Sequence, residues 1–314
     1  MKEQNQEEKK EENKEQTLLV PSTSSQILKK LGLGVVYGLG VAACIFVSLH
    51  LAAIHLEERL LLVPHKLKSY KYFNVDKKNK ESKTMEYHEL KSGGCVIKLK
   101  NNQQSGNREI VLLHGNAGSI DDMAPIGFAL KQKGYNVLLV EYYGFGCCYE
   151  NGNQEKKVSA GTLLEDVKET WSTIVKNPKE AILAGFSMGG GCIGQLLDEI
   201  KEQDHPKQVV LINTYCSLPQ LVQEWLPFTV MGYMMKTQWQ SEKGLNKYKN
   251  KEVVVVYSVD DELIGNHHAE KLIEISERNA NKTTKIALPN GGHSGSFMIH
   301  LNAWTNHLLI PFVS

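Results

Sequence analysis

A serine framed by glycines is the first residue of this chain whose surroundings suggest chemistry. Ser187 lies at the centre of a GxSxG pattern between Gly185 and Gly189, after the short apolar run at residues 181–184. A sharp turn from strand to helix leaves no room for side chains at the two glycine positions, and it leaves the serine exposed at its tip. A serine hydroxyl is a weak nucleophile unless a base and oxyanion donors lie beside it. The pattern also fits an ordinary glycine-rich turn. Whether Ser187 is a nucleophile therefore depends on whether a base, an acid and oxyanion donors accompany it.

Carboxylates and a histidine follow in the order that such a serine needs. Asp260 and Asp261 come two and three residues after the apolar run at residues 253–258, and His293 follows two glycines in a loop. Carboxylates at the ends of strands in open α/β sheets gather at the edge where sites lie. His293 can then take the proton of Ser187 while one aspartate orients its ring. Either aspartate could instead cap a helix, and a loop histidine is often only solvated.

A second glycine-rich run, at residues 112–118, ends another apolar stretch and precedes a helix-like segment. An oxyanion donor belongs at this place in an acyl-transfer site, and we expect the backbone amide of Asn116 to provide it. The amide of Met188, at the start of the helix after Ser187, is the expected second donor. His114 lies in the same run, and we expect it to be structural and hydrogen-bonded to the loop.

Short β-branched runs alternate with helix-length stretches from about residue 86 onward. Several runs are continuously apolar, which is typical of strands covered on both faces and predicts a mostly parallel sheet. The expected strands are residues 95–99, 110–114, 136–141, 181–184, 209–213, 253–258 and 284–288. The expected helices are residues 121–133, 163–175, 191–201, 267–278 and 297–309. This order predicts an α/β fold with helices on both faces of the sheet.

The connection between the strands expected at residues 209–213 and 253–258 is about 40 residues long, which suits two or three helices but not a separate lid domain. We therefore expect an open site. The connection carries apolar residues, several of them flexible methionines that suit irregular acyl chains: Trp225, Leu226, Phe228, Val230, Met231, Tyr233, Met234 and Met235. The alternative is that these residues only cover the sheet.

The N-terminal part differs in composition from the rest. Residues 1–30 begin with a highly charged stretch, and we expect a disordered tail. Residues 31–54 contain no Lys, Arg, Asp or Glu, and a helix over them would be about 36 Å long, enough to cross a bilayer. We expect one transmembrane helix at residues 31–56, a linker at 57–85 and a globular domain at 86–314.

A cleaved signal sequence and a buried globular helix are the alternatives for the apolar segment. If it spans a membrane, basic residues on both sides leave the side of the globular domain undetermined. Gly34 and Gly38 form a GxxxG pattern, which predicts at most a weak dimer through this helix.

The overall charge narrows the class of partner. The formal net charge is +1, and no basic stripe interleaved with aromatic residues is present, so we expect no nucleic-acid partner. The six cysteines show no CxxC pair and no metal-ligand spacing, so we expect neither a metal nor another cofactor.

From residue 86 to the C-terminus the sequence resembles α/β-hydrolase fold serine hydrolases, in the membrane-anchored branch of α/β-hydrolase domain-containing proteins. Four motifs carry the resemblance in chain order: HGNAG at residues 114–118, GFSMGG at 185–190, the pattern S-x-x-D-x-x-I at Ser258, Asp261 and Ile264, and GGH at 291–293. The resemblance selects Asp261 over Asp260 as the acid. It departs at Tyr143, where the family's DYRGYG run has arginine, so an ion pair made by that arginine is not expected here.

The resemblance implies a catalytic triad of Ser187, His293 and Asp261, with the amides of Asn116 and Met188 as the oxyanion hole. It implies hydrolysis of an acyl ester or thioester through an acyl-enzyme, without a cofactor, and a lipid-like or acylated substrate met at a membrane. A serine peptidase on the same fold is one alternative. A catalytically silent scaffold is the other, although a purely structural role would not require all three triad residues.

Overall fold

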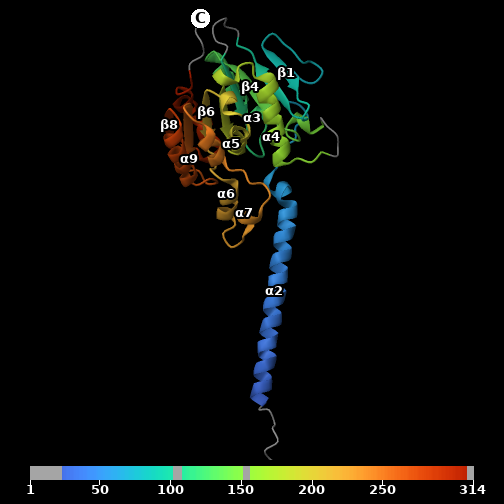
Figure 1. The fold of residues 1–314 in the computed structure, drawn as a ribbon. Helices are drawn as coiled ribbons and strands as arrows, with labels where there is room; N and C mark the ends of the chain where they lie inside the picture. Colours follow the sequence, from blue (N-terminus) through green and yellow to red (C-terminus); the bar gives the residue numbers. More distant parts are fainter. Residues whose placement is uncertain (1–22, 102–107, 151–155, 310–314) are drawn as a thin grey trace, which may run out of the picture. The chain divides into compact units, whose positions relative to one another are not determined.

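The computed structural model describes residues 23–101, 108–150 and 156–309. The chain forms two compact units, Met1–Ala53 and Ile54–Ser314. The long helix α2 (Thr23–Leu61) contributes residues to both units (Figure 1).

Helix α2 contains a segment, Val35–Ala53, that is long and apolar enough to cross a membrane by length and composition. A signal sequence near an N-terminus has the same properties. The helix is longer than predicted, because it begins within the expected tail and ends after residue 56. Residues 57–62, Glu-Glu-Arg-Leu-Leu-Leu, are good helix formers, and no proline lies between residue 22 and Pro64. The rest of the predicted tail, residues 1–22, lies outside the described residues.

The second unit is built on an eight-stranded sheet with the order β1-β2-β4-β3-β5-β6-β7-β8. The strands are β1 (Met85–Glu89), β2 (Cys95–Leu99), β3 (Glu109–Leu113), β4 (Asn136–Glu141), β5 (Ile182–Phe186), β6 (Gln208–Ile212), β7 (Glu252–Ser258) and β8 (Lys282–Leu288). β1 pairs antiparallel with β2, and β2 with β4, whereas the pairs from β4 to β8 are parallel. The carboxyl ends of the parallel strands therefore share one edge.

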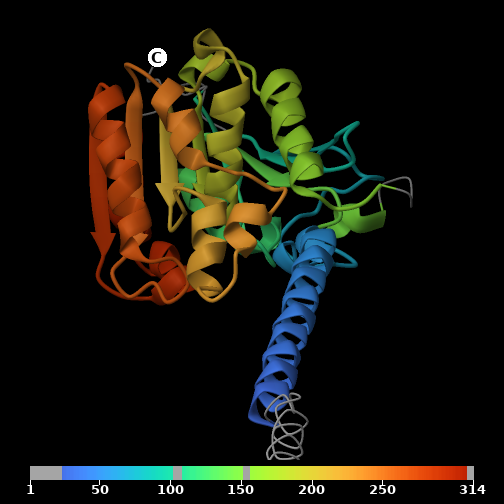
Figure 2. The same ribbon diagram turned by 60° about the horizontal axis from the view of Figure 1, so that its bottom comes forward.

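Helices cover both faces of this sheet (Figures 1 and 2). The longer ones are α3 (Ile120–Gln132), α4 (Ala160–Glu169) with a π-helical turn (Thr170–Ile174), α5 (Met188–Glu199) and α9 (Asn266–Asn279), and the shorter ones are α6 (Leu218–Trp225), α7 (Met231–Met234), α8 (Ser241–Lys247), α10 (Gly292–Ile299) and α11 (Leu301–Thr305). Helices α4, α5, α8 and α9 pack on strand residues such as Val111 and Leu211. Helices α3, α10 and α11 pack on the other face, against residues such as Leu112 and Val210.

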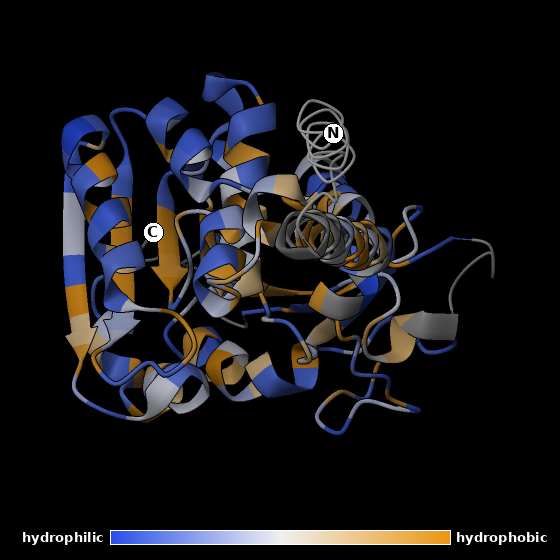
Figure 3. Cartoon of the chain, turned by 90° about the horizontal axis from the view of Figure 1, so that it is seen from below, coloured by the Kyte–Doolittle hydropathy of each residue, from blue (hydrophilic) through white to orange (hydrophobic). Residues whose placement is uncertain are grey.

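Consecutive strand residues thus enter opposite cores, which is why the central strands read as continuous apolar runs. In Figure 3 the inner strands are mainly hydrophobic, whereas the surrounding helices alternate hydrophobic and hydrophilic residues. The seven predicted strands correspond to β2–β8, with ends shifted by no more than two residues. Four of the five predicted helices are present, whereas the one expected at residues 297–309 is replaced by two short helices, α10 and α11. β1 was not predicted, because Glu86, His88 and Glu89 interrupt its apolar pattern and only Tyr87 is buried.

The segment predicted as a linker, residues 57–85, packs on the sheet. Phe73 and Val75 are buried with β2 and α3 in one core. Two backbone hydrogen bonds join this segment to Gly146. The amide of Leu67 donates to the carbonyl of Gly146, and the amide of Gly146 donates to the carbonyl of His65. The compact unit therefore begins at Ile54 rather than at residue 86.

Candidate active site

Ser187 occupies a strained turn between β5 and α5. Its backbone lies in the left-handed region, with φ 52° and ψ −116°, a conformation that costs on the order of 1–3 kcal/mol for a residue other than glycine. The amide of Ser187 donates to the carbonyl of Ile212 at 2.9 Å, which ties the turn to β6. A Cβ at Gly185 would lie 2.5 Å from the backbone of Gly189, and one at Gly189 would lie 2.4 Å from Leu113 O. Both glycines are therefore required by close approach of the backbone.

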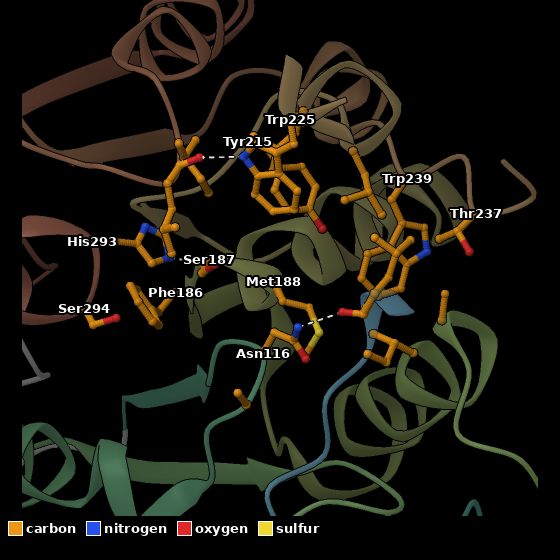
Figure 4. Close-up of a pocket in the computed structure, with 18 residues that line it drawn as sticks. Asn116, Phe186, Ser187, Met188, Tyr215, Trp225, Thr237, Trp239, His293 and Ser294 are labelled. Carbon is orange, nitrogen blue, oxygen red and sulfur yellow. Dashed lines mark hydrogen bonds between the residues drawn. The ribbon is translucent and has the colours of Figure 1, made fainter. Parts of the chain in front are cut away.

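The structure brings Ser187, His293 and Asp261 together from three separate strand ends. Figure 4 shows His293 beside Ser187. Nε2 of His293 lies 3.0 Å from Oγ of Ser187, and Nδ1 lies 2.9 Å from Oδ2 of Asp261. The side chains of His293 and Asp261 are almost completely buried. Since the carboxylate can only accept, Nδ1–H donates to Asp261, and Nε2 of a neutral ring presents its lone pair to the serine hydroxyl. This is the arrangement in which histidine can act as a general base.

Asp261 is fixed by its own neighbours. Its Oδ1 accepts hydrogen bonds from the amides of Leu263 and Ile264, at 2.9 and 2.8 Å. The side chain therefore faces His293 in one orientation, as an acid that positions an imidazole must.

Asp260, the other candidate acid, has a different set of partners among the described residues, and the His293 ring is not one of them. Its carboxylate accepts from Ser258 Oγ at 2.6 Å and from the amides of Gly292 and Gly291 at 2.9 and 3.1 Å. These hydrogen bonds, with that of Ser258 the strongest, hold the pKa of Asp260 below its ordinary value. Gly291 has φ 110° and Gly292 has φ 62°, so the loop before His293 needs glycine at both places.

The two expected oxyanion donors lie beside the serine. Met188 is the first residue of α5, and Asn116 lines the same cavity as Ser187. Neither backbone amide donates a hydrogen bond to another of the described residues, so both are available to a ligand. The Asn116 side chain is occupied, because its Nδ2 donates to the carbonyl of Leu61 at 2.7 Å and its Oδ1 accepts from the amide of Val63 at 2.9 Å.

Ser187 opens into a cavity of about 390 Å³ with mainly apolar walls. Leu218, Leu221 and Trp225 of α6 form one wall, and Leu61 and Leu62 at the end of α2 form part of another. Figure 4 shows the Trp225 and Trp239 side chains around this space. The sequence reasoning missed Leu61 and Leu62, although the apolar run Leu-Leu-Leu-Val at residues 60–63 was a visible signal for burial against the domain.

The connection between β6 and β7 forms three helices, α6, α7 and α8, as predicted. The predicted apolar group is mostly exposed rather than packed on the sheet. Met231 and Met235 are buried. The remaining members are exposed, most of all Phe228 at 96% and Tyr233 at 80%: Trp225, Leu226, Phe228, Val230, Tyr233 and Met234. These six residues are called the apolar surface below.

His114 is structural, as expected. It is fully buried, with Nδ1 2.8 Å from the carbonyl of Gly115 and Nε2 2.8 Å from Oε1 of Glu141. Tyr143, in place of the family's arginine, donates its hydroxyl to the carbonyl of Lys156 and its amide to Asp166. Neither residue lines the cavity around Ser187.

Comparisons with known proteins agree with this fold. A family model described as "Serine aminopeptidase, S33" (Hydrolase_4) matches residues 104–291. The uncharacterized protein YfhR of Escherichia coli K12 is 25% identical over 194 residues, 60% of this chain and 63% of YfhR. YfhR of Salmonella typhimurium is 23% identical over 200 residues, 60% of this chain and 65% of that protein. The match therefore spans less than two thirds of these relatives.

Solved structures show the same fold at low identity. The Pyrococcus furiosus esterase Pf2001 superposes with a TM-score of 0.55 and 16% identity, over 78% of this chain and 96% of the esterase. An enol-lactonase of Burkholderia xenovorans LB400 gives 0.52 and 16%, over 70% and 96%. These structures share the fold, and the family model over residues 104–291 shows that the chain is an α/β-hydrolase that belongs to the serine aminopeptidase S33 family.

Proposed function

We propose that this protein hydrolyses an acyl ester or thioester of a lipid-like molecule, with Ser187, His293 and Asp261 as its catalytic triad. The main support is His293, whose two ring nitrogens face Ser187 Oγ and the Asp261 carboxylate at 3.0 and 2.9 Å. That geometry activates a serine and holds the base in the required tautomer.

In the proposed reaction, Nε2 of His293 removes the proton from Ser187 Oγ as the oxygen attacks the acyl carbonyl carbon. The carbonyl oxygen becomes an oxyanion, which accepts hydrogen bonds from the amides of Asn116 and Met188. Collapse of this intermediate expels an alcohol or thiol that takes the proton from His293. Water, deprotonated by His293, then attacks the acyl-enzyme, releases the carboxylic acid and restores Ser187.

The walls of the cavity support an acyl substrate over a peptide with a free amino terminus. Among the described residues that line it there is no Asp, Glu, Lys or Arg. A charged α-amino group would lose its hydration there without gaining a carboxylate partner, which costs several kcal/mol. An aminopeptidase, the activity named in the family description, would need such a partner. An acyl chain has no charge to desolvate and gains about 0.8 kcal/mol for each buried methylene.

We further propose that α2 anchors the enzyme in a membrane. The described side chains of Val35–Ala53 are exposed apart from His50 and the half-buried Ala53, whereas a core helix would be mostly buried. The apolar surface supports a substrate taken from a lipid phase, because exposed apolar groups rimmed by polar residues are typical of membrane or protein contact sites. Carbonate extraction tests the anchor: full-length protein should stay in the membrane pellet, and its release at high pH would contradict the proposal.

The experiment that tests the activity uses purified full-length protein with three substrates: a lysophospholipid, a long-chain acyl thioester and an aminoacyl p-nitroanilide. We expect turnover of at least one of the first two and none of the third. The matched variant is Ser187→Ala, which should remove all turnover. Cleavage of the anilide alone would establish the peptidase alternative, and a wild type as inactive as Ser187→Ala would favour the silent scaffold.

A further inference from the structure

A group of three metal-ligating side chains lies outside the catalytic site. Glu224 is near the end of α6, and His267 and His268 are in the first turn of α9. Oε1 of Glu224 lies 2.9 Å from Nε2 of His267, and Oε2 lies 3.1 Å from Nε2 of His268. One ligand atom from each residue lies within 4.8 Å of the other two. It is the one such group among the residues that the structure describes.

The side-chain types of this group suit a metal ion. The cluster offers one carboxylate and two imidazoles, which are ligand types that Zn²⁺ binds.

Cys216 orients the buried ring of His268 through the ring nitrogen that faces away from Glu224. Nδ1 of His268 lies 3.1 Å from Sγ of Cys216 and 3.4 Å from its amide nitrogen. Without a metal, Nδ1 can accept from Cys216 while Nε2–H donates to Glu224. With a metal on Nε2, the ring proton moves to Nδ1 and the Cys216 sulfur accepts it. Both tautomers have partners, so the ring need not turn to bind an ion, and metal-binding histidines usually have such a second partner.

We propose that Glu224, His267 and His268 bind one zinc ion, with water completing a tetrahedral shell. Tetrahedral ligands at 2.0–2.2 Å from zinc lie about 3.4 Å apart. The Nε2 atoms of His267 and His268 lie 2.9 and 3.1 Å from the Glu224 oxygens, which is a few tenths of an ångström shorter. The side chains of Glu224 and His267 are 35% and 51% exposed, which gives an ion an entry path from solvent.

The position of the cluster gives the ion a role in binding substrate rather than in bond cleavage. Glu224 directly precedes Trp225, and α6 supplies a wall of the cavity. Leu263 and Ile264, which precede α9, line the same cavity, and Nε1 of Trp225 donates to the carbonyl of Leu263 at 3.0 Å (Figure 4). An ion shared by Glu224 and the two histidines would tie α6 to the start of α9. It would thereby restrict movement of this wall.

The binding test uses purified full-length protein, treated with chelator, dialysed and titrated with ZnCl₂ by calorimetry. We expect one zinc per chain with a micromolar dissociation constant. Glu224→Gln and His267→Ala, both at exposed positions, should each weaken binding at least tenfold. Glu270→Gln, on the exposed side of α9, and His300→Ala are matched controls that should bind as the wild type does. No binding by the wild type, or equal binding by Glu224→Gln, would overturn the proposal.

Cobalt identifies the ligands. Co²⁺ in place of zinc should give visible bands of a tetrahedral site with nitrogen and oxygen ligands, and Glu224→Gln should lose them. A sulfur-to-cobalt charge-transfer band would show binding at a thiolate instead, and would also overturn the assignment. These readouts need no enzymatic activity.

The effect on substrate rests on the proposed function and is measured separately. If that function holds, zinc at saturation should lower KM for a long-chain ester about threefold in the wild type, with little change in kcat, and leave KM of Glu224→Gln unchanged. Zinc binding without any ester or thioester hydrolysis would remove the proposed function and keep the site. If the enzyme hydrolyses the ester with a KM that zinc does not change, the proposed role of the ion in substrate binding is wrong.

Discussion

The carboxylate of Asp260 accepts a hydrogen bond from the amide of Gly292 at 2.9 Å, while its neighbour Asp261 contacts the imidazole of His293. Two adjacent acids thus act on one histidine at different points, one on the loop that carries it and one on its ring. The distinction predicts different kinetic effects for substitutions that are chemically identical.

Asp261→Asn should lower kcat on an ester substrate by about 10³-fold or more, because the neutral amide cannot stabilise the imidazolium and its NH2 group facing Nδ1 favours the wrong tautomer of His293. Asp260→Asn should cost far less, since an amide oxygen still accepts from the loop amides. Steady-state kinetics of both variants, with stability checked by thermal unfolding, makes the comparison. Equal losses, or a larger loss for Asp260→Asn, would show that the acid is assigned to the wrong residue.

Ser187 should react covalently with a fluorophosphonate probe, because His293 Nε2 is positioned to take its proton. Ser187→Ala should show no labelling, and His293→Ala should show strongly reduced labelling together with a loss of turnover of about 10³-fold or more. Mass spectrometry of the labelled peptide identifies the modified residue. Modification of another serine with Ser187 untouched would refute the assignment.

Asn116→Ala should lower kcat/KM for long-chain esters about tenfold while leaving the backbone amide in place. The variant removes two hydrogen bonds to residues 61–63, each worth about 1 kcal/mol, and so loosens the wall formed by Leu61 and Leu62. The dependence of kcat/KM on acyl length is the measurement, since a short acetyl ester barely reaches this wall. An equal loss for both esters would place the effect at the oxyanion instead.

Stability should depend on pH through Asp166. Burial raises its pKa from 3.8 to about 6, even though the amides of Gly94 and Tyr143 donate to it. The folded state holds this proton more tightly than the unfolded chain, so the stabilisation is complete below pH 3.8 and is lost as the pH rises through about 6.

Asp166→Asn cannot titrate. Between pH 4.5 and 7, its free energy of unfolding should therefore gain about 2 kcal/mol relative to that of the wild type. Urea unfolding at several pH values measures this difference, with the exposed Glu165→Gln as the control. A constant difference across this range would mean that Asp166 has an ordinary pKa.

Phe228 and Tyr233 should matter only for substrates in a bilayer. Their exposed rings can bury apolar area in lipid, so Phe228→Ser with Tyr233→Ser should reduce turnover of a vesicle-bound ester severalfold. Turnover of a soluble short-chain ester should not change. Exposed Glu270→Gln serves as the control, and a loss on both substrates would point to a folding defect.

The parts of the fold and site that could be predicted are those determined by residues close together in the sequence. GxSxG fixes the turn at Ser187, because backbone contacts at Gly185 and Gly189 exclude side chains. The continuously apolar runs predict the parallel strands for the same local reason. β1 could not be predicted, since its order comes from pairing with β2 rather than from its own pattern.

Contacts between segments that lie far apart in the sequence could not be predicted from sequence patterns. Spacing alone could not separate Asp260 from Asp261, because both partners of Asp260 in the glycine loop lie some 30 residues away. Family resemblance was needed to choose between them. Glu224 meets His267 and His268 only because α6 folds back beside α9, so no spacing rule for metal ligands would have found the cluster.

Leu61, the last residue of α2, and Leu62, which follows it, both line the cavity, and the Asn116 side chain holds this stretch by hydrogen bonds. A protease that cut after Leu62 would therefore carry away part of the binding wall along with the helix. Because the end of the N-terminal helix also lines the cavity, losing or replacing this helix would change which substrates fit the cavity. Changes at the end of this helix and changes in specificity should consequently have been inherited together.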